Sequence, residues 1–120
     1  MELEKYLESI GGVIDWRNRI YTTPKVFQVD EGWYPLIQNL IQELVELGWD
    51  RKISQVKEKF GGLRFYTDNT TDEMEKVISK YERLSYETCE MCGEKGKLRT
   101  DLAWHSTLCD EHYEESKSKS

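Results

Sequence analysis

The sequence feature that most constrains the fold is a set of cysteine and histidine residues in the C-terminal third of the chain. Cys89 and Cys92 form a Cys-x-x-Cys pair, Cys109 and His112 form a Cys-x-x-His pair, and an insert of hairpin length separates the two. Two such pairs match the spacing of structural zinc sites, because Zn²⁺ favours a tetrahedron of thiolate and imidazole ligands. We therefore predict one structural Zn²⁺ per chain, held by these four residues.

Other chemistries fit the cysteine pattern less well. A redox-active Cys-x-x-Cys pair usually begins a helix, whereas here Gly93 follows directly and a helical pattern ends just before the pair. A disulfide framework would leave one of the three cysteines unpaired, and no signal peptide precedes them. One alternative ligand stays open, because His105 lies shortly before Cys109 and could replace His112.

The predicted order of this segment is a cysteine knuckle, a β-hairpin and a helix whose first turn carries the last two ligands. The acidic residues that follow Cys109 favour a helix N-terminus. This arrangement resembles a treble-clef zinc finger over residues 87–116. The resemblance implies a metal site and a fold but no single function, since the module serves in nucleic-acid binding, protein binding and nucleases.

The chain is predicted to have a body and a metal-stabilised appendage. The segments are an α+β body over residues 1–86, the zinc module over residues 87–116 and a disordered polar tail over residues 117–120. No apolar run approaches the ~20 residues needed to span a membrane, and the N-terminus is acidic rather than a targeting peptide. We expect a cytoplasmic protein.

Apolar residues at helical spacing predict helices over residues 3–10, 35–47 and 74–84. Residues 13–31 are harder to interpret: two short strands are possible, but an irregular segment is favoured. We therefore expect an α+β fold in which two or three helices pack on a small antiparallel hairpin or sheet, with the zinc module at its C-terminal end.

The segment from residue 53 to residue 68 predicts a β-hairpin around Gly61 and Gly62. Two glycines supply the positive φ angles of a type I′ turn, and a Gly-Gly loop places Lys59 opposite Arg64. Because side chains alternate along a strand, one face of this hairpin is apolar and should pack on a helix. The predicted members of this apolar face are Val56, Phe60, Leu63 and Phe65, together with Glu58.

The opposite face of the hairpin, the basic face, carries Lys57, Lys59, Arg64 and Tyr66. Like charges directly opposite each other destabilise a hairpin, so this arrangement has an energetic cost. Two interpretations stay open: the face is solvated or neutralised by the chain's own carboxylates, or it binds an anionic partner. Because the net charge of the chain is −6, any contact with nucleic acid must come from such a local patch.

Several segments of the chain carry distinctive motifs, namely Asp30-Glu-Gly-Trp33 with Leu36-Ile37, Gln55-Val-Lys-Glu-Lys-Phe-Gly-Gly-Leu-Arg-Phe-Tyr66, Thr88-Cys-Glu-Met-Cys-Gly93 and the segment from Trp104 to His112. Together they resemble a family of small proteins from phage, prophage and bacterial genomes. The resemblance covers about residues 30–113. It implies a bacterial or phage cytoplasmic setting, and it brings no established activity, catalytic residue or partner.

Three classes of function follow. The favoured one is a small zinc-binding interaction module that binds a host protein or an anionic ligand, with inhibition of a host factor as the form that a phage setting suggests. The second is a nucleic-acid or nucleotide binder, whose candidate contacts are Lys57, Lys59 and Arg64 for phosphate and Tyr66, Trp16 or Trp104 for stacking. A metal-dependent nuclease is least favoured, because His105 would be the sole remaining neutral-pH base and four protein ligands leave no position for an activated water.

Overall fold

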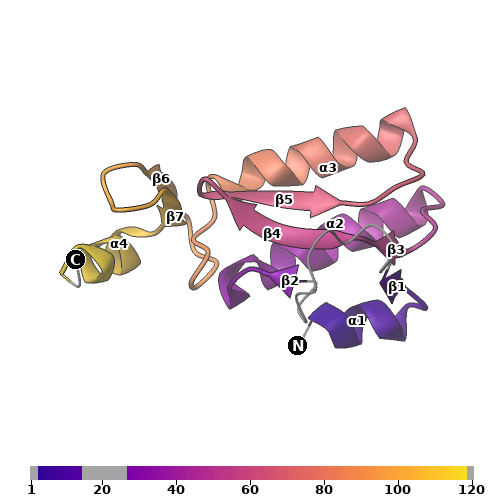
Figure 1. Ribbon diagram of the computed structural model, residues 1–120, viewed down its shortest axis with the longest axis horizontal. Coiled ribbons are helices and arrows are strands. Elements are labelled where there is room, and N and C mark those ends of the chain that lie inside the picture. Colours follow the sequence, from indigo (N-terminus) through magenta and orange to yellow (C-terminus); the bar gives the residue numbers. More distant parts are fainter. Residues whose placement is uncertain (1–2, 15–26, 119–120) are drawn as a thin grey trace.

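The computed structural model describes residues 3–14 and 27–118 and has the predicted α+β architecture (Figure 1). Its described helices are α1 (Leu3–Ser9), the 3₁₀ turn η2 (Glu31–Trp33), α2 (Tyr34–Glu46), α3 (Asp72–Ser85) and α4 (Asp110–Ser118). Its described strands are β1 (Val13–Ile14), β2 (Phe27–Gln28), β3 (Lys52–Ile53), β4 (Gln55–Lys59), β5 (Gly62–Tyr66), β6 (Lys97–Arg99) and β7 (Ser106–Leu108). None of these helices is long and apolar enough to cross a membrane.

The central sheet has three strands in the order β2-β4-β5. The sequence predicted a small antiparallel hairpin or sheet, whereas this sheet contains both antiparallel and parallel pairs. Strands β4 and β5 form the predicted antiparallel hairpin, but β2 lies parallel to β4, with Phe27 opposite Val56. Parallel pairing needs a long crossover, which the α2 segment between the two strands supplies. Strands β1 and β3 pair in the same way. Within residues 13–31, where the sequence favoured an irregular segment, β1 and β2 are therefore short strands. Residues 15–26, which include Trp16, lie outside the described residues.

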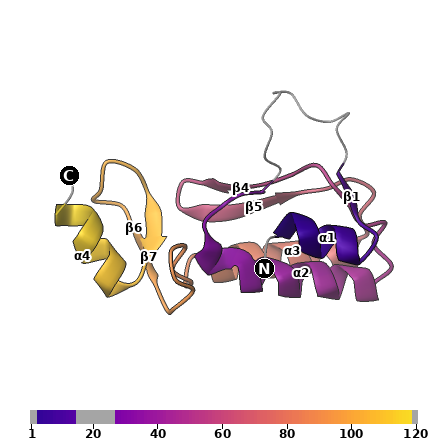
Figure 2. The same ribbon diagram turned by 90° about the horizontal axis from the view of Figure 1, so that it is seen from below.

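Helices α2 and α3 lie on the same side of the β4–β5 hairpin and bury its apolar face (Figure 2). The apolar stripe predicted for α2 is at the centre of the core, where Ile37, Leu40, Ile41 and Leu44 are fully buried. Burial of each such side chain contributes ~1.5–3 kcal/mol. At the surface, Glu43 of α2 accepts hydrogen bonds from Lys80 and Tyr81 of α3, which fixes the two helices side by side.

The hairpin turn differs from the prediction by one residue. Lys59 pairs with Gly62 and Lys57 pairs with Arg64, so the two-residue loop is Phe60-Gly61 rather than Gly61-Gly62. Phe60 adopts a positive φ of 54° and is 67% exposed, which corrects its predicted place in the core. The pairing register differs from the prediction by two residues. Because this number is even, all the remaining predicted side chains keep the face that the sequence assigned to them.

The reason for the shifted turn lies in contacts from distant parts of the chain. A Cβ atom on Gly62 would lie 2.3 Å from the ring of Tyr86, so this position needs glycine within the strand. The Gly61 carbonyl accepts a hydrogen bond from the Thr107 hydroxyl, and the Gly61 N–H donates to the Glu58 carboxylate. These contacts stabilise Gly61 within the turn, and they offset the energetic cost of the left-handed backbone conformation at Phe60.

Strand β5 is an edge strand of the sheet, and side chains of α3 cover that edge. The N–H of Leu63 donates to the Ser85 hydroxyl, and the N–H of Phe65 donates to the Glu82 carboxylate. Ser85 is fully buried. The N–H groups of Leu63 and Phe65, which point away from β4, are therefore hydrogen-bonded to side chains of the neighbouring helix α3.

The C-terminal module is joined to the body through η2. The Gly32 N–H donates to the Glu90 carbonyl at 2.7 Å, and the indole N–H of Trp33, whose side chain is fully buried, donates to the Thr88 carbonyl at 2.8 Å. At its other end the module extends further than predicted, because α4 continues through Lys117 and Ser118, which the sequence assigned to a disordered tail.

Substitution Gly32→Ala tests this junction. A Cβ at Gly32 would lie 2.3 Å from the Cys89 carbonyl oxygen and 2.4 Å from that of Glu90, so backbone must move. We expect the free energy of unfolding to fall by ~1–3 kcal/mol or more. Thermal unfolding measures the change, with Gly48→Ala as control, because that site has open space and tests only the cost of its positive φ. An equal, small loss in both variants would contradict the close approach.

Candidate metal centre

The four predicted ligands come from two local structures that their sequences favour. Cys89 and Cys92 lie in a tight knuckle, where the Gly93 N–H donates to the Cys89 carbonyl and Gly93 has a φ of +83°. Cys109 immediately precedes α4, and His112 lies in the first turn of that helix. With the β6–β7 hairpin between them, the order of knuckle, hairpin and helix is that of a treble clef.

The ligand atoms of these four residues all lie within 4.8 Å of one another, so the group could hold a metal ion. A tetrahedral Zn²⁺ with standard bond lengths requires about 3.8 Å between two sulfurs and about 3.6 Å between sulfur and nitrogen. The Sγ atoms of Cys92 and Cys109 are 3.8 Å apart, and His112 Nδ1 lies 3.6 Å from the Cys89 Sγ and 3.2 Å from the Cys109 Sγ. The donor set and its spacing therefore fit Zn²⁺.

The imidazole of His112 is oriented for this role. Its Nδ1 faces the sulfurs, while its Nε2 lies 4.0 Å from a carboxylate oxygen of Glu115, one turn further along α4. Metal-binding histidines commonly direct their second nitrogen to a carboxylate, which fixes the ring. The alternative ligand His105 is exposed in the β6–β7 loop and is not a member of the group.

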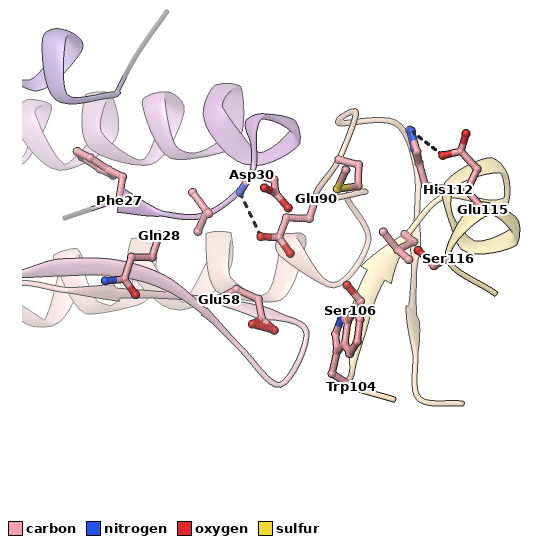
Figure 3. Close-up of a pocket in the computed structure, with 13 residues that line it drawn as sticks. Phe27, Gln28, Asp30, Glu58, Glu90, Trp104, Ser106, His112, Glu115 and Ser116 are labelled. Atoms are coloured by element: carbon pink, nitrogen blue, oxygen red, sulfur yellow. Dashed lines mark hydrogen bonds and ion pairs between the residues drawn. The ribbon is translucent and has the colours of Figure 1, made fainter. Parts of the chain in front are cut away.

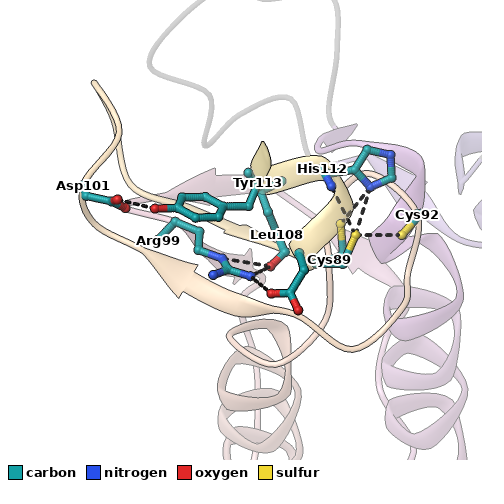
Figure 4. Close-up of polar contacts among 9 residues, drawn as sticks. Cys89, Cys92, Arg99, Asp101, Leu108, His112 and Tyr113 are labelled. Atoms are coloured by element: carbon teal, nitrogen blue, oxygen red, sulfur yellow. Dashed lines mark hydrogen bonds and ion pairs between the residues drawn. The ribbon is translucent and has the colours of Figure 1, made fainter. Parts of the chain in front are cut away.

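Polar contacts around Arg99 hold the hairpin and helix of the module together (Figure 4). The Arg99 guanidinium donates to the Leu108 carbonyl and pairs with Asp110 at 2.8 Å, and it lies 4.2 Å from the centre of the Tyr113 ring. The Tyr113 hydroxyl donates to Asp101. Because α4 has no buried residue, these polar contacts are important for attaching it to the hairpin.

The predicted basic face lies on the side of the hairpin away from α2 and α3. Within the described part of the chain, no carboxylate pairs with the charged groups of Lys57, Lys59 or Arg64. The Arg64 guanidinium instead donates to the Tyr86 hydroxyl at 3.4 Å, a contact that raises the pKa of Arg64. The Lys57 ammonium lies 5.7 Å from the centre of the Tyr66 ring.

The structure also contains a cavity that the sequence analysis did not predict (Figure 3). It has a volume of about 540 Å³ and lies between the body and the module. Glu90, the residue after the first cysteine, lines this cavity and is only 7% exposed. Burial raises the pKa of Glu90 to about 7; the Asp30 N–H opposes this change, and the carboxylates of Asp30 and Glu58 add to it.

No family model, curated protein or solved structure matches this chain. The site must therefore be interpreted from its own geometry.

Proposed function

We propose that the protein is a zinc-stabilised binding module whose basic face, formed by Lys57, Lys59, Arg64 and Tyr66, engages an anionic partner. The observation that carries the proposal is that, among the described residues of a chain whose net charge is −6, no carboxylate lies within ion-pair distance of Lys57, Lys59 or Arg64. Glu82 acts on Arg64 only through a longer-range charge interaction. In such a chain, solvent-exposed carboxylates are abundant. Cations that form no close ion pair within the described part of the chain keep their charge for contact with another molecule.

The placement of the residues supports this function. Lys57 lies directly opposite Arg64, so the repulsion between like charges predicted for the hairpin is present, with a different pair from the predicted one. Tyr86 and the Leu63 carbonyl orient the Arg64 guanidinium while leaving other N–H donors available. Tyr66 is 41% exposed beside them and offers a ring for stacking.

The metal has a structural role in this proposal. We infer Zn²⁺ because three thiolates and one imidazole at these spacings match its preferred ligands. Four protein ligands complete a tetrahedron, which favours a structural over a catalytic centre. The resemblance to phage and prophage proteins adds the proposal that the anionic partner belongs to a bacterial host.

Charge reversal on the basic face tests the function. The variant Lys59→Glu/Arg64→Glu should bind a labelled mixed-sequence single-stranded oligonucleotide at least about tenfold more weakly than the unmodified protein, because charge-assisted contacts are lost. For contacts from three cations, the logarithm of the association constant should fall with the logarithm of salt concentration with a slope of about −2. Fluorescence anisotropy at several salt concentrations measures both quantities, and thermal unfolding shows that the variant is folded at the temperature of the measurement.

The matched control is Lys76→Glu/Lys95→Glu, which changes the net charge equally at exposed sites away from the basic face. It should leave the affinity within about twofold of the unmodified protein, since its sites contact no ligand. A mononucleotide and a poly-glutamate peptide, titrated in parallel, distinguish a nucleotide or an acidic protein surface from nucleic acid. Equal weakening by both double variants, or no binding of any of these anions, would contradict the proposal.

A further inference from the structure

The cavity between body and module has a wall of unusual composition. Its described lining includes four carboxylates, Asp30, Glu58, Glu90 and Glu115, and no lysine or arginine. Apolar side chains complete the lining, namely Phe27, Val29, Met91, Trp104 and Leu108. Its volume falls within the range of small-molecule sites, which are usually apolar with a few placed polar groups.

Glu90 is the most informative of these carboxylates. It is 7% exposed, and within the described part of the chain only its Oε2 has a hydrogen-bond partner, the Asp30 N–H at 3.2 Å. Among the described residues no donor reaches its other oxygen, which lies beside the cavity (Figure 3). Glu58 is half-buried; its Oε1 accepts a hydrogen bond from the Gly61 N–H, and no other described residue donates to this carboxylate. A buried carboxylate oxygen without a donor is costly, so a ligand that donates a hydrogen bond to Glu90 would stabilise it.

The arrangement does not suit a metal ion. Among the described residues, the one group of His, Cys, Asp and Glu side chains close enough to hold a metal is the Cys89, Cys92, Cys109 and His112 group. The cavity carboxylates are therefore too dispersed to coordinate a common ion. Trp104, which is 68% exposed at the cavity wall, offers instead the aromatic face that attracts organic cations.

We propose that this cavity binds an organic cation, an alkyl guanidinium or alkyl ammonium group, with its charge against the Glu58 and Glu90 carboxylates and its alkyl chain along Trp104. The N–H donors of such a group pair with the Glu58 and Glu90 oxygens that have no donor among the described residues, and its methylene groups contact the apolar wall. This site is separate from the basic face and has the opposite charge. Its occupancy does not depend on the anionic partner.

Calorimetric titration of the zinc-loaded protein tests the site with two guanidinium probes, agmatine and N-acetyl-arginine amide. The neutral comparator is N-acetyl-citrulline amide, which has a similar shape without the charge. Saturable binding of a guanidinium probe is expected, with the comparator at least about tenfold weaker. Tighter binding of agmatine assigns the site to free amines, whereas tighter binding of the blocked arginine assigns it to an arginine side chain of a polypeptide.

Variants then locate the binding. Glu90→Gln and Glu58→Gln should each weaken the guanidinium probe about tenfold, and Trp104→Ala about fivefold. The matched control Glu87→Gln removes an exposed carboxylate of the same module that does not line the cavity, and it should have no effect. Zinc content and melting temperature show whether each variant is folded, and Glu58→Gln and Trp104→Ala test the site without altering the knuckle.

Four results would overturn the proposal. The first is no saturable binding of either guanidinium probe, and the second is equal binding of the citrulline comparator. The third is unchanged affinity in folded Glu58→Gln and Trp104→Ala variants. Displacement of the probe by Mg²⁺ or Ca²⁺ at equal concentration would likewise show a metal site in place of the organic-cation site.

Discussion

Chelation of the metal is expected to unfold residues 87–118 while the helix–sheet body stays folded. The module has a very small hydrophobic core. Helix α4 has no buried residue, and Leu108 of β7 is the one large aliphatic side chain of the module that is buried. Apparent zinc-binding free energies of ~10–16 kcal/mol in finger peptides far exceed what this small core could supply. The body, in contrast, retains the fully buried residues of α2 and the hairpin.

Amide hydrogen exchange with and without chelator measures this result segment by segment. Protection should disappear over the knuckle, β6, β7 and α4, and should persist in α2, α3, β4 and β5. The body should nevertheless lose stability, because unfolding of the knuckle removes the Thr88 carbonyl from the buried indole of Trp33, at a cost of ~1–3 kcal/mol. Protein purified without chelator that contains no metal would contradict the zinc assignment.

The fourth ligand is tested in the same preparation. His112→Ala should lose zinc, and His105→Ala should keep it, because His112 Nδ1 faces the sulfurs whereas His105 is exposed in the β6–β7 loop. Elemental analysis of both variants measures the outcome. The reverse pattern would assign the fourth position to His105.

Substitution Phe65→Ala is expected to lower the free energy of unfolding by ~3–5 kcal/mol, which threatens a domain of this size. Phe65 is 4% exposed, its ring lies 6.0 Å from that of Trp49, and its strand is buried by α3. Removal of the ring leaves a cavity that the surrounding helices cannot fill. Denaturant unfolding monitored by circular dichroism measures the loss.

Phe60 provides the matched control within the same hairpin. Because Phe60 is 67% exposed with a φ of 54°, Phe60→Asn should be neutral or stabilising by up to ~1 kcal/mol, since Asn-Gly is a favoured type I′ turn. In the register predicted from sequence, with Phe60 in the core, the same change would cost as much as Phe65→Ala. Similar losses at the two positions would therefore contradict the observed turn.

These residues show which parts of the structure the sequence could predict. The proximity of Cys89, Cys92, Cys109 and His112 was predictable because Cys-x-x-Cys and Cys-x-x-His spacings fix local geometry whatever surrounds them. The hairpin faces were predictable because period-two alternation survives a register change of two residues. The turn itself was not, because the choice between Phe60-Gly61 and Gly61-Gly62 depends on Tyr86 and Thr107, which are distant in sequence.

Other features were beyond sequence reasoning for related reasons. Strand β2 has two residues, too few for any periodicity, and its parallel pairing depends on the α2 crossover. The cavity takes its walls from β2, β4, the knuckle, the β6–β7 hairpin and α4, so no single stretch reveals it. One signal was present: Glu90 places an acidic residue between the two cysteines of a knuckle that packs on Gly32.

The covering of β5 by α3 limits how the protein can meet other chains. With the Leu63 and Phe65 donors bound by Ser85 and Glu82, an incoming strand would find no free N–H row on that edge. Addition of a strand from another chain, which underlies both peptide binding at sheet edges and edge-to-edge aggregation, is therefore disfavoured at the β5 edge. A partner that bound at this edge would therefore have to contact side chains rather than the N–H groups of β5, so point substitutions could alter its specificity without a change in the backbone.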